Sequence, residues 1–407
     1  MEVVDKIVLS KDVYQKTEIG KIPRDWEVKK INEIADVNKE NLSGNTPAEY
    51  EFYYYDLSSV DKGKVLHPTE KLKFADAPSR AKRLFKTNDV LMSTVRPNLQ
   101  GFTYVDFDST NSVCSTGFAV IAGKYESDSM YIYQNLFSYG ITRQIQKLLV
   151  GSNYPAINSK DVENLKVPFP NDNKEREKIA SILSTWDKAI ELKEKLIEQK
   201  KEQKKGLMQK LLTGEVRLPG FKEEWEEVKL GKIATIIMGQ SPTSDSYNDL
   251  QEGIPLIQGN ADIKKRKTCP RIWTTKPTKK CLPGDIIVTV RAPVGSVALS
   301  HHEACIGRGV CAIRGSINQD YLYYLLIQKE NWWSKISQGS TFESVNSNDI
   351  KELKVSMPPM MEQQAVSKVL KTFDQDLYLH EKELVEAKKQ KQGLMQLLLT
   401  GKVRVKV

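Results

Sequence analysis

The pattern of apolar and polar positions changes once within each half of this 407-residue chain. Residues 20–170 and 215–358 mix short β-branched runs with Gly, Pro, Asn and Asp, a texture typical of α/β or α+β domains. Within them, Val90–Val95 and Ile286–Val290 each follow an Asn-Asp or Gly-Asp turn, and we expect both to be buried strands. Prolines then end this texture in each half, and helix-forming sequence follows.

Two long segments carry apolar residues at helical spacing, with Glu, Lys and Gln between them. Each could form a helix of about 38 residues, roughly 57 Å long, the first from about Asn173 to Leu212 and the second from about Met361 to Leu399. Propensity alone rarely stabilises a lone helix of that length, so we expect the two to pair as an antiparallel coiled coil. The alternative is that each helix packs on its own globular domain; the polar centre Glu191–Lys205 favours the coil. The apolar positions expected to pair are Ile179, Leu183, Trp186, Ile190, Ile197, Leu207, Val366, Leu370, Phe373, Leu377, Leu384 and Leu394.

The chain also contains an internal repeat with a period of about 190 residues, far longer than that of a solenoid. Matching strings occur in the same order in both halves: Asp25–Lys29 with Glu224–Lys229, Gly44–Pro47 with Gly239–Pro242, Asn88–Pro97 with Gly284–Pro293, Tyr131–Tyr133 with Tyr321–Tyr323, Gly151–Val162 with Gly339–Ile350, and Gly206–Gly214 with Gly393–Gly401. We therefore predict an α+β fold with internal pseudo-two-fold symmetry. Two similar globular domains, 1–170 and 213–358, would alternate with helical regions 171–212 and 359–407.

Composition narrows the class of protein. The formal net charge is +9 and the pI is near 9.0, which favours a polyanionic partner, although a charge surplus is often only a solvated surface. The five cysteines include no Cys-x-x-Cys pair and fit reduced thiols in a cytosol. Apolar runs such as Ile233–Met238 are far too short to span a membrane, and the N-terminus does not read as a secretory signal. We expect a cytoplasmic protein with no membrane partner.

Motifs for catalysis are missing from the sequence. It has no phosphate-binding loop, no dinucleotide fingerprint and no Gly-x-Ser-x-Gly elbow. The string nearest to the catalytic tetrad of an adenine methyltransferase, Met357–Met360, lacks both the polar group and the stacking ring. His301 and His302 lie near Cys305 and Cys311 at a spacing that matches no common zinc site. We therefore expect neither a catalytic centre nor a metal site in this chain.

Two basic clusters precede the expected strands, and the sequence places them at equivalent positions in the repeat. Their Lys and Arg side chains could neutralise DNA phosphates, and an Arg could read guanine; the alternative is a solvated basic loop. The candidates are Lys71, Lys73, Arg80, Lys82 and Arg83 in the first half, and Lys264, Lys265, Arg266, Lys267, Arg271, Lys279 and Lys280 in the second.

Three further residues complete the candidate DNA-binding set. Arg96 and Arg291 follow the two expected strands at what the sequence suggests is the same repeat position. Each could either support a loop by pairing with a carboxylate or reach towards a base. Tyr154 belongs to a Gly-Ser loop for which ordinary turn chemistry is the alternative.

Together these features resemble the specificity (S) subunit of type I restriction–modification systems. The most specific strings are Thr17–Val28, Gly284–Gly295 and the twice-used Gly-Leu-Met-Gln…Leu-Thr-Gly, and the resemblance covers nearly the whole chain. It implies that domains 1–170 and 213–358 are target recognition domains, each reading one part of a split double-stranded DNA sequence. The helical regions would be spacers that set the distance between the half-sites.

The resemblance also implies partners. Two adenine-N6 methyltransferase (M) subunits would dock on the helical regions, and ATP-dependent restriction/translocase (R) subunits would join them. S-adenosylmethionine, ATP and Mg²⁺ would then belong to those partners, and this chain would be non-catalytic. Because the two domains differ in their loops, the half-sites should differ, at roughly 10 base pairs centre to centre. The alternatives are a stand-alone DNA-binding regulator or coiled-coil scaffold without restriction partners, and an autonomous nuclease.

Overall fold

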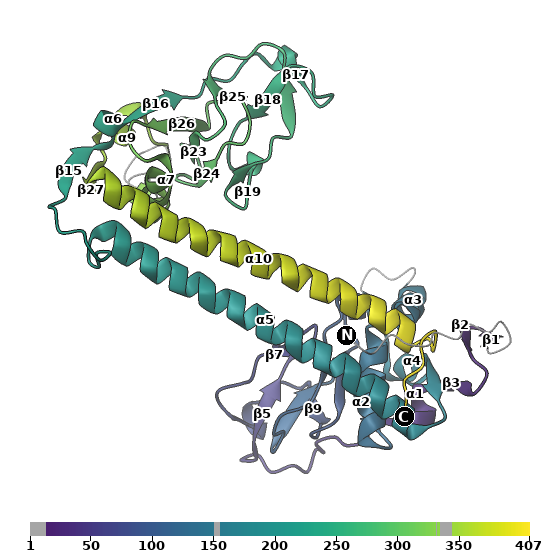
Figure 1. The fold of residues 1–407 in the computed structure, drawn as a ribbon. Coiled ribbons are helices and arrows are strands. Elements are labelled where there is room, and N and C mark those ends of the chain that lie inside the picture. The colour runs from purple at the N-terminus through teal and green to yellow at the C-terminus, as the bar shows by residue number, and fades with distance from the viewer. Residues whose placement is uncertain (1–13, 150–154, 331, 334–343) are drawn as a thin grey trace. The chain divides into compact units, whose positions relative to one another are not determined.

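The computed structural model describes residues 14–149, 155–330, 332–333 and 344–407. The chain divides into two compact units: unit 1 comprises Met1–Glu194 with Glu383–Val407, and unit 2 comprises Lys195–Lys382. Two long helices, α5 (Asn173–Thr213) and α10 (Met360–Leu398), each contribute one end to each unit (Figure 1). Among the described residues, no helix combines the length and the apolar character needed to cross a membrane.

Unit 1 is built on two four-stranded sheets with the strand orders β11-β10-β13-β4 and β8-β5-β12-β9. Their strands are β4 (Ala35–Val37), β5 (Glu51–Tyr55), β8 (Leu72–Lys73), β9 (Ala81–Leu84), β10 (Val90–Ser93), β11 (Phe102–Tyr104), β12 (Ser112–Ser115) and β13 (Phe118–Gly123). Three two-stranded pairs accompany them: β1 (Tyr14–Thr17) with β2 (Gly20–Pro23), β3 (Trp26–Lys30) with β14 (Lys166–Pro170), and β6 (Val60–Asp61) with β7 (Lys64–Val65). The helices are α1 (Ile31–Ile34), α2 (Glu126–Leu136), α3 (Tyr139–Leu148) and α4 (Ser159–Glu163), and the 3₁₀ turns are η1 (Leu57–Ser59), η2 (Phe74–Asp76) and η3 (Pro97–Leu99).

Unit 2 has a six-stranded sheet, β16-β26-β23-β24-β20-β19, a five-stranded sheet, β17-β21-β18-β25-β22, and the pair β15–β27. The strands are β15 (Glu226–Lys229), β16 (Ala234–Met238), β17 (Tyr247–Asn248), β18 (Ile254–Ile257), β19 (Ile263–Lys264), β20 (Lys267–Thr268), β21 (Ile272–Thr274), β22 (Lys280–Cys281), β23 (Ile286–Thr289), β24 (Val297–Leu299), β25 (Ala304–Ile306), β26 (Val310–Gly315) and β27 (Lys354–Met357). The helices are α6 (Leu230–Ile233), α7 (Gln319–Gln328) and α9 (Ser347–Glu352), and the 3₁₀ turns are η4 (Ser244–Ser246) and η5 (Asn260–Asp262).

The strand pairings of unit 1 recur in unit 2. The order β11-β10-β13-β4 corresponds to β24-β23-β26-β16, and the parallel pair β5–β12 corresponds to β18–β25. The antiparallel pairs β3–β14 and β15–β27 lead into α5 and α10, respectively. Strands β10 and β23 are buried at every residue, as the sequence predicts. The internal duplication is therefore one of topology as well as of sequence.

One of the best-matching strings of the repeat forms a helix start. Asn158 accepts a hydrogen bond from the backbone N–H of Asp161, whose carboxylate accepts one from the backbone N–H of Asn158. Asn346 and Asp349 make the same reciprocal pair at the start of α9. This arrangement is a capping box, which satisfies amide groups that the helix itself leaves unpaired. The need to cap these two helices explains why Asn and Asp recur at the same places in both halves.

The ends of α5 and α10 are buried in the cores of the globular domains. In unit 1, Ile179, Leu183, Leu398 and Leu399 share one apolar core with strand and α2 residues. The equivalent core of unit 2 contains Leu211, Leu212, Val366 and Leu370. Of the positions predicted to pair the helices, Ile179, Leu183 and Leu394 contribute to the first core, and Leu207, Val366 and Leu370 to the second. At their ends, the helices therefore pack on the domains as well as on each other.

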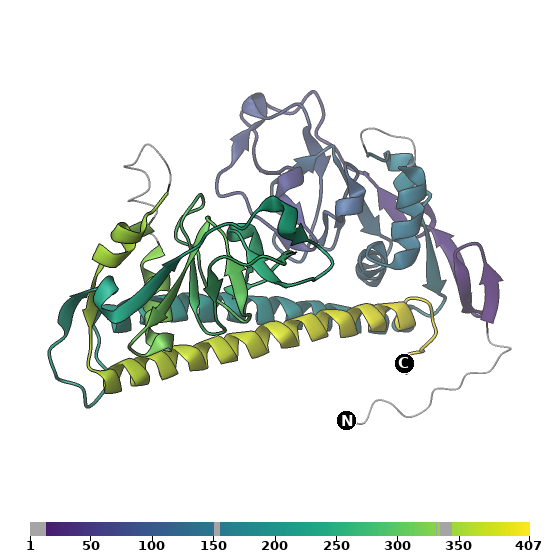
Figure 2. The same ribbon diagram turned by 90° about the horizontal axis from the view of Figure 1, so that it is seen from above.

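Nearer the middle of the helices, ion pairs join α5 to α10 within each unit, where the two run side by side in opposite directions (Figure 1 and Figure 2). In unit 1, Lys388 contacts Glu194 at 2.6 Å and Lys391 pairs with Asp187. In unit 2, Lys201 contacts Glu381 at 3.6 Å and Lys204 contacts Asp374 at 2.5 Å. The remaining predicted pairing positions are buried (Ile197, Leu377) or half-buried (Trp186, Ile190, Phe373, Leu384). The pairing therefore combines a narrow apolar seam with flanking charges.

Candidate nucleic-acid interface

Several of the basic residues predicted to contact DNA are already paired with acidic residues. Lys73 contacts Glu49 at 2.6 Å and Lys280 contacts Glu303 at 3.2 Å. In unit 2, Arg271 contacts Asp262 at 2.9 Å. Arg266 forms a two-pronged pair with Glu330. These pairs lower the charge available to a phosphate, because each would have to be weakened before a new contact formed.

Arg83 is half-buried in unit 1, with its guanidinium bonded to other parts of the unit. Its guanidinium donates to the carbonyl oxygen of Phe118 and, at 3.3 Å, to the hydroxyl of Ser159. Burial lowers the pKa of this group. Arg83 therefore connects β9 to the first residue of β13 and to the first residue of α4, which is a structural role.

The other candidate cations are exposed, and their side chains form no hydrogen bond or ion pair with any described residue. They are Lys71, Arg80, Lys82 and Arg96 in unit 1, and Lys264, Lys265, Lys267, Lys279 and Arg291 in unit 2. The ammonium group of Lys71 does lie 5.5 Å from the centre of the Tyr53 ring. Tyr154 lies outside the described residues. These unpaired cations are the residues best prepared to meet a polyanion, and their role as DNA contacts stays a prediction.

The two basic clusters hold equivalent places only in part. Arg80 and Lys82, in or beside β9, correspond to Lys279 and Lys280, in or beside β22, but Lys264–Lys267 do not correspond to Lys71 and Lys73. Strands β19–β20, which carry Lys264–Lys267, follow η5 as β6–β7 follow η1 in unit 1. Lys71 and Lys73 instead lie at β8, the counterpart of β21. No matching strings of the repeat lie between Pro47 and Asn88, so the basic residues in this segment were aligned by charge alone and not by strand order.

Arg96 and Arg291 are also one residue out of register. The backbone N–H groups of Thr94 and Val290 donate to Gly117 and Gly309, respectively, which makes Thr94 and Val290 equivalent. Arg291 therefore corresponds to Val95, and Arg96 lies one position further along. Arg96 has a left-handed backbone (φ 48°) and donates its N–H to Pro155 at 2.7 Å. Both side chains are exposed, and neither pairs with a described carboxylate.

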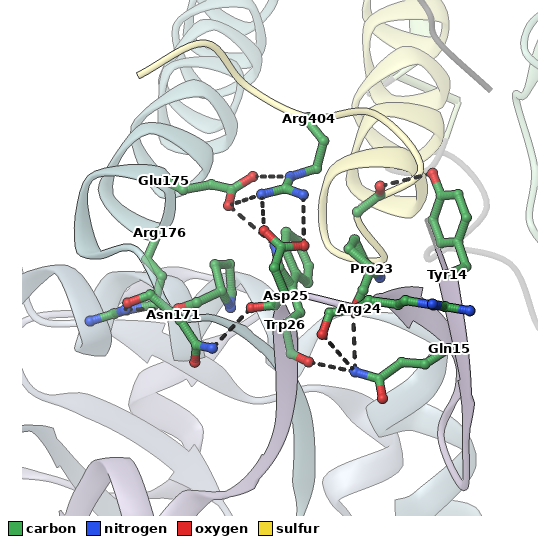
Figure 3. Close-up of polar contacts among 12 residues, drawn as sticks. Tyr14, Gln15, Pro23, Arg24, Asp25, Trp26, Asn171, Glu175, Arg176 and Arg404 are labelled. Carbon is green, nitrogen blue, oxygen red and sulfur yellow. Dashed lines mark hydrogen bonds and ion pairs between the residues drawn. The ribbon is translucent and has the colours of Figure 1, made fainter. Parts of the chain in front are cut away.

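A duplicated Trp–Glu–Arg cluster escaped the sequence analysis. In unit 1, Trp26 donates its indole N–H to Glu175 at 3.2 Å, and Arg404 donates to both oxygens of Glu175 at 2.6 and 2.8 Å and to Asp25 at 2.9 Å (Figure 3). Hydrogen bonds from Arg404 lower the pKa of Asp25. The end of the chain is thereby fixed to the start of α5.

Unit 2 contains the same cluster with different residues. Trp225 donates to Glu362 at 3.1 Å, and Arg217 donates to the same carboxylate at 2.6 Å. The hydrogen bond to Glu362 raises the pKa of Arg217. The segment after each long helix thus holds the start of the other helix. A Val-Arg pair follows Leu-Thr-Gly in both copies of the repeat and was the sequence signal for it.

A second duplicated contact joins the globular domain of each unit to the helix pair. Gln134 of α2 donates to Asp187 at 2.9 Å, and Tyr324 of α7 donates to Asp374 at 2.7 Å. Each aspartate also pairs with a lysine of the opposite long helix, Lys391 or Lys204. In each unit, the globular domain is therefore connected to both long helices through one aspartate.

Known proteins resemble this chain in both of its halves. A family model described as the type I restriction modification DNA specificity domain matches residues 23–201 and 222–389. The MjaX specificity subunit of a type I restriction enzyme of Methanocaldococcus jannaschii is 32% identical, over 97% of each chain. The MjaVIII specificity subunit of the same organism is 26% identical, over 95% of each chain.

A solved structure is similar as well. It comes from work on complex assembly and conformational transition of the type I restriction–modification system, and it has a TM-score of 0.66 at 29% identity over 94% of this chain and 99% of that one. The predicted α+β fold, with two similar domains and paired long helices, is confirmed. The chain belongs to the family of type I restriction–modification DNA specificity subunits.

Proposed function

We propose that this chain is the non-catalytic DNA-recognition subunit of a type I restriction–modification complex and that it reads a bipartite, asymmetric double-stranded target. The observation that carries the proposal is the duplicated unit: the same strand order, capping boxes and Trp–Glu–Arg clusters occur twice. A framework used twice on one chain suits two reading events on one duplex.

The asymmetry of the target follows from the differences between the units. At equivalent strands, the partly exposed residues are Tyr53 and Tyr54 in unit 1 and Ile254 and Pro255 in unit 2. Some unpaired cations also differ in place: Lys264 on β19 is matched by Asp61 on β6 of unit 1. Two surfaces that differ in side chains and charge would prefer different base sequences, because base contacts specify and phosphate contacts only position.

Partners follow from membership of the family and from the missing catalytic motifs. We propose two methyltransferase subunits bound along the helical regions, with restriction/translocase subunits joining them, all in the cytoplasm. S-adenosylmethionine, ATP and Mg²⁺ would be bound by those subunits. Exposed apolar side chains on the helices, Leu192 and Val385 in unit 1 and Tyr378 and Leu379 in unit 2, offer docking area to a partner.

Mapping methylated adenines across the host genome, with the chain present and deleted, tests the proposal. We expect a two-part motif with unlike halves that disappears on deletion and returns when the chain is restored. A continuous palindromic site, or a methylation pattern that does not depend on the chain, would contradict it. A stand-alone regulator would also purify without a methyltransferase-sized partner.

A further inference from the structure

The equivalent hairpins β6–β7 and β19–β20 differ at their turns. Both turns place two successive residues in the left-handed region: Lys62 (φ 46°) and Gly63 (φ 85°) in unit 1, and Lys265 (φ 47°) and Arg266 (φ 63°) in unit 2. Such turns favour Asn and Gly, because a side chain there is strained. The first position carries a lysine in both units, but at the second unit 2 keeps a long basic side chain, Arg266, where unit 1 has a glycine. A use for the Arg266 side chain would offset that strain.

The second left-handed position differs because of what lies beneath it. A Cβ on Gly63 would come within 2.7 Å of the Tyr133 hydroxyl, so unit 1 has no room for a side chain there. In unit 2, Arg266 occupies this position and donates to Glu330 at 2.9 Å and to the carbonyl oxygen of Val297 at 3.2 Å. Arg266 therefore acts as a bracket that supports the turn of the hairpin.

The charges on the two hairpins are also used differently. In unit 1, Lys64 contacts Glu194 at 2.5 Å, and Glu194 is also held by Lys388 at 2.6 Å. In unit 2, Lys264, Lys265 and Lys267 are exposed and form no ion pair with any described residue. Their hairpin is nevertheless firmly placed, since β20 pairs with β24 and the N–H of Leu299 donates to Arg266 at 3.0 Å. Of these two hairpins, β19–β20 is the one whose three lysines are unpaired among the described residues, and it lies at the edge of a sheet that holds it in place.

We infer that the hairpin β19–β20 binds the phosphate backbone of double-stranded DNA without regard to sequence, through Lys264, Lys265 and Lys267. Arg266 is a positioning residue that fixes the hairpin through Glu330. The two half-sites are then held unequally, with unit 2 supplying more of the salt-sensitive affinity. The inference rests on the proposed function, because it requires unit 2 to face DNA.

Salt titration of DNA binding by the full chain, in complex with its methyltransferase, tests the inference. The probe is a labelled duplex of arbitrary sequence, compared with the same duplex carrying the target. Substituting Lys264, Lys265 and Lys267 together by Ala should lower the slope of log affinity against log salt by roughly 2 to 3, at about 0.9 per phosphate contact. The matched variant Lys62→Ala/Lys64→Ala should lower it by about 1 at most, because Lys64 is already paired.

The variant Arg266→Gly separates positioning from folding. Glycine restores the residue that unit 1 has at this turn and relieves the strain, so the thermal unfolding midpoint should fall little. The salt slope should nevertheless drop by about 1, because the three lysines are retained but their hairpin is no longer fixed by Arg266. An unchanged slope together with normal unfolding would remove Arg266 from the account.

The outcomes distinguish this inference from the proposed function. An unchanged slope in the triple variant, with the methylated motif intact, would overturn the hairpin's role alone. An equal drop in the unit 1 control would overturn the asymmetry. If the wild-type complex showed no preference for any DNA sequence, the proposed function itself would fail.

Discussion

Units 1 and 2 share their strand order but differ in how they use charge at the surface. The same kinds of contact hold each unit together: a Trp–Glu–Arg cluster, a capping box, and an aspartate on one long helix that contacts both the other helix and the globular domain. The hairpins differ: Lys64 is paired in one, whereas Lys264, Lys265 and Lys267 of the other have no ion-pair partner in the part of the chain that the structure describes. The duplication thus preserves the framework and leaves the reading surfaces free to diverge.

The clusters at the starts of the long helices are alike but not equal. Arg404 in unit 1 is shared between Glu175 and Asp25, whereas Arg217 in unit 2 has the Glu362 carboxylate and the backbone carbonyl oxygen of Glu223. Glu175 and Glu362 are both nearly fully buried. The arginine of unit 2 is therefore held by one carboxylate, whereas that of unit 1 is held by two.

Lengthening one helix should give the largest effect. Four residues inserted after Lys200 would extend α5 by about 6 Å. If the helices set the spacing of the half-sites, the methylated motif should keep both halves and change the number of bases between them. Sequencing methylated adenines in cells that express the variant measures this directly. Retention of the original spacing, in a variant that still methylates, would show that the helices are not the ruler.

Removing the buried carboxylate should be the next largest change and should differ between the units. Glu362→Ala leaves Trp225 and Arg217 without their acceptor, and we expect a loss of about 3 kcal/mol in the free energy of unfolding. Glu175→Ala should cost less, about 2 kcal/mol, because Arg404 keeps Asp25. Urea unfolding of the two variants gives the comparison. Equal losses would mean that the ion pair between Asp25 and Arg404 does not compensate for the loss of Glu175.

The sequence predicted the framework well because it depends on buried and local patterns. Strands β10 and β23 were identified from short apolar runs after turns, and the capping boxes are short strings that match in both halves. Arg404 and Glu175 are far apart in the chain, so no local pattern links them. Lys264–Lys267 were wrongly matched to Lys71 and Lys73 because charge, unlike strand pairing, carries no register.

A smaller difference is expected at the aspartates that join the domains to the helices. Tyr324 donates to Asp374 at 2.7 Å, so Tyr324→Phe should lower the free energy of unfolding by about 1 kcal/mol. Gln134→Leu in unit 1 should cost less, because the buried side-chain oxygen of Gln134 has no partner among the described residues. Thermal unfolding of both variants tests the order. A larger loss from Gln134→Leu would reverse the comparison.

The smallest effect concerns acid stability, and it distinguishes the two clusters. Hydrogen bonds from Arg404 lower the native pKa of Asp25. The pair therefore stabilises unit 1 above the ordinary carboxyl value near 4, and this contribution is lost as the pH falls through the native pKa. Asp25→Asn should flatten the loss of stability between about pH 5 and pH 3.

Glu224 provides the control in unit 2. It holds the place of Asp25 beside Trp225 but forms no ion pair with a described residue. Glu224→Gln should therefore leave the acid profile of the protein unchanged. If Asp25→Asn kept the wild-type profile, or Glu224→Gln altered it as much, the second carboxylate would have no part in holding Arg404. Each Trp–Glu–Arg cluster would then depend on a single carboxylate, Glu175 in unit 1 and Glu362 in unit 2.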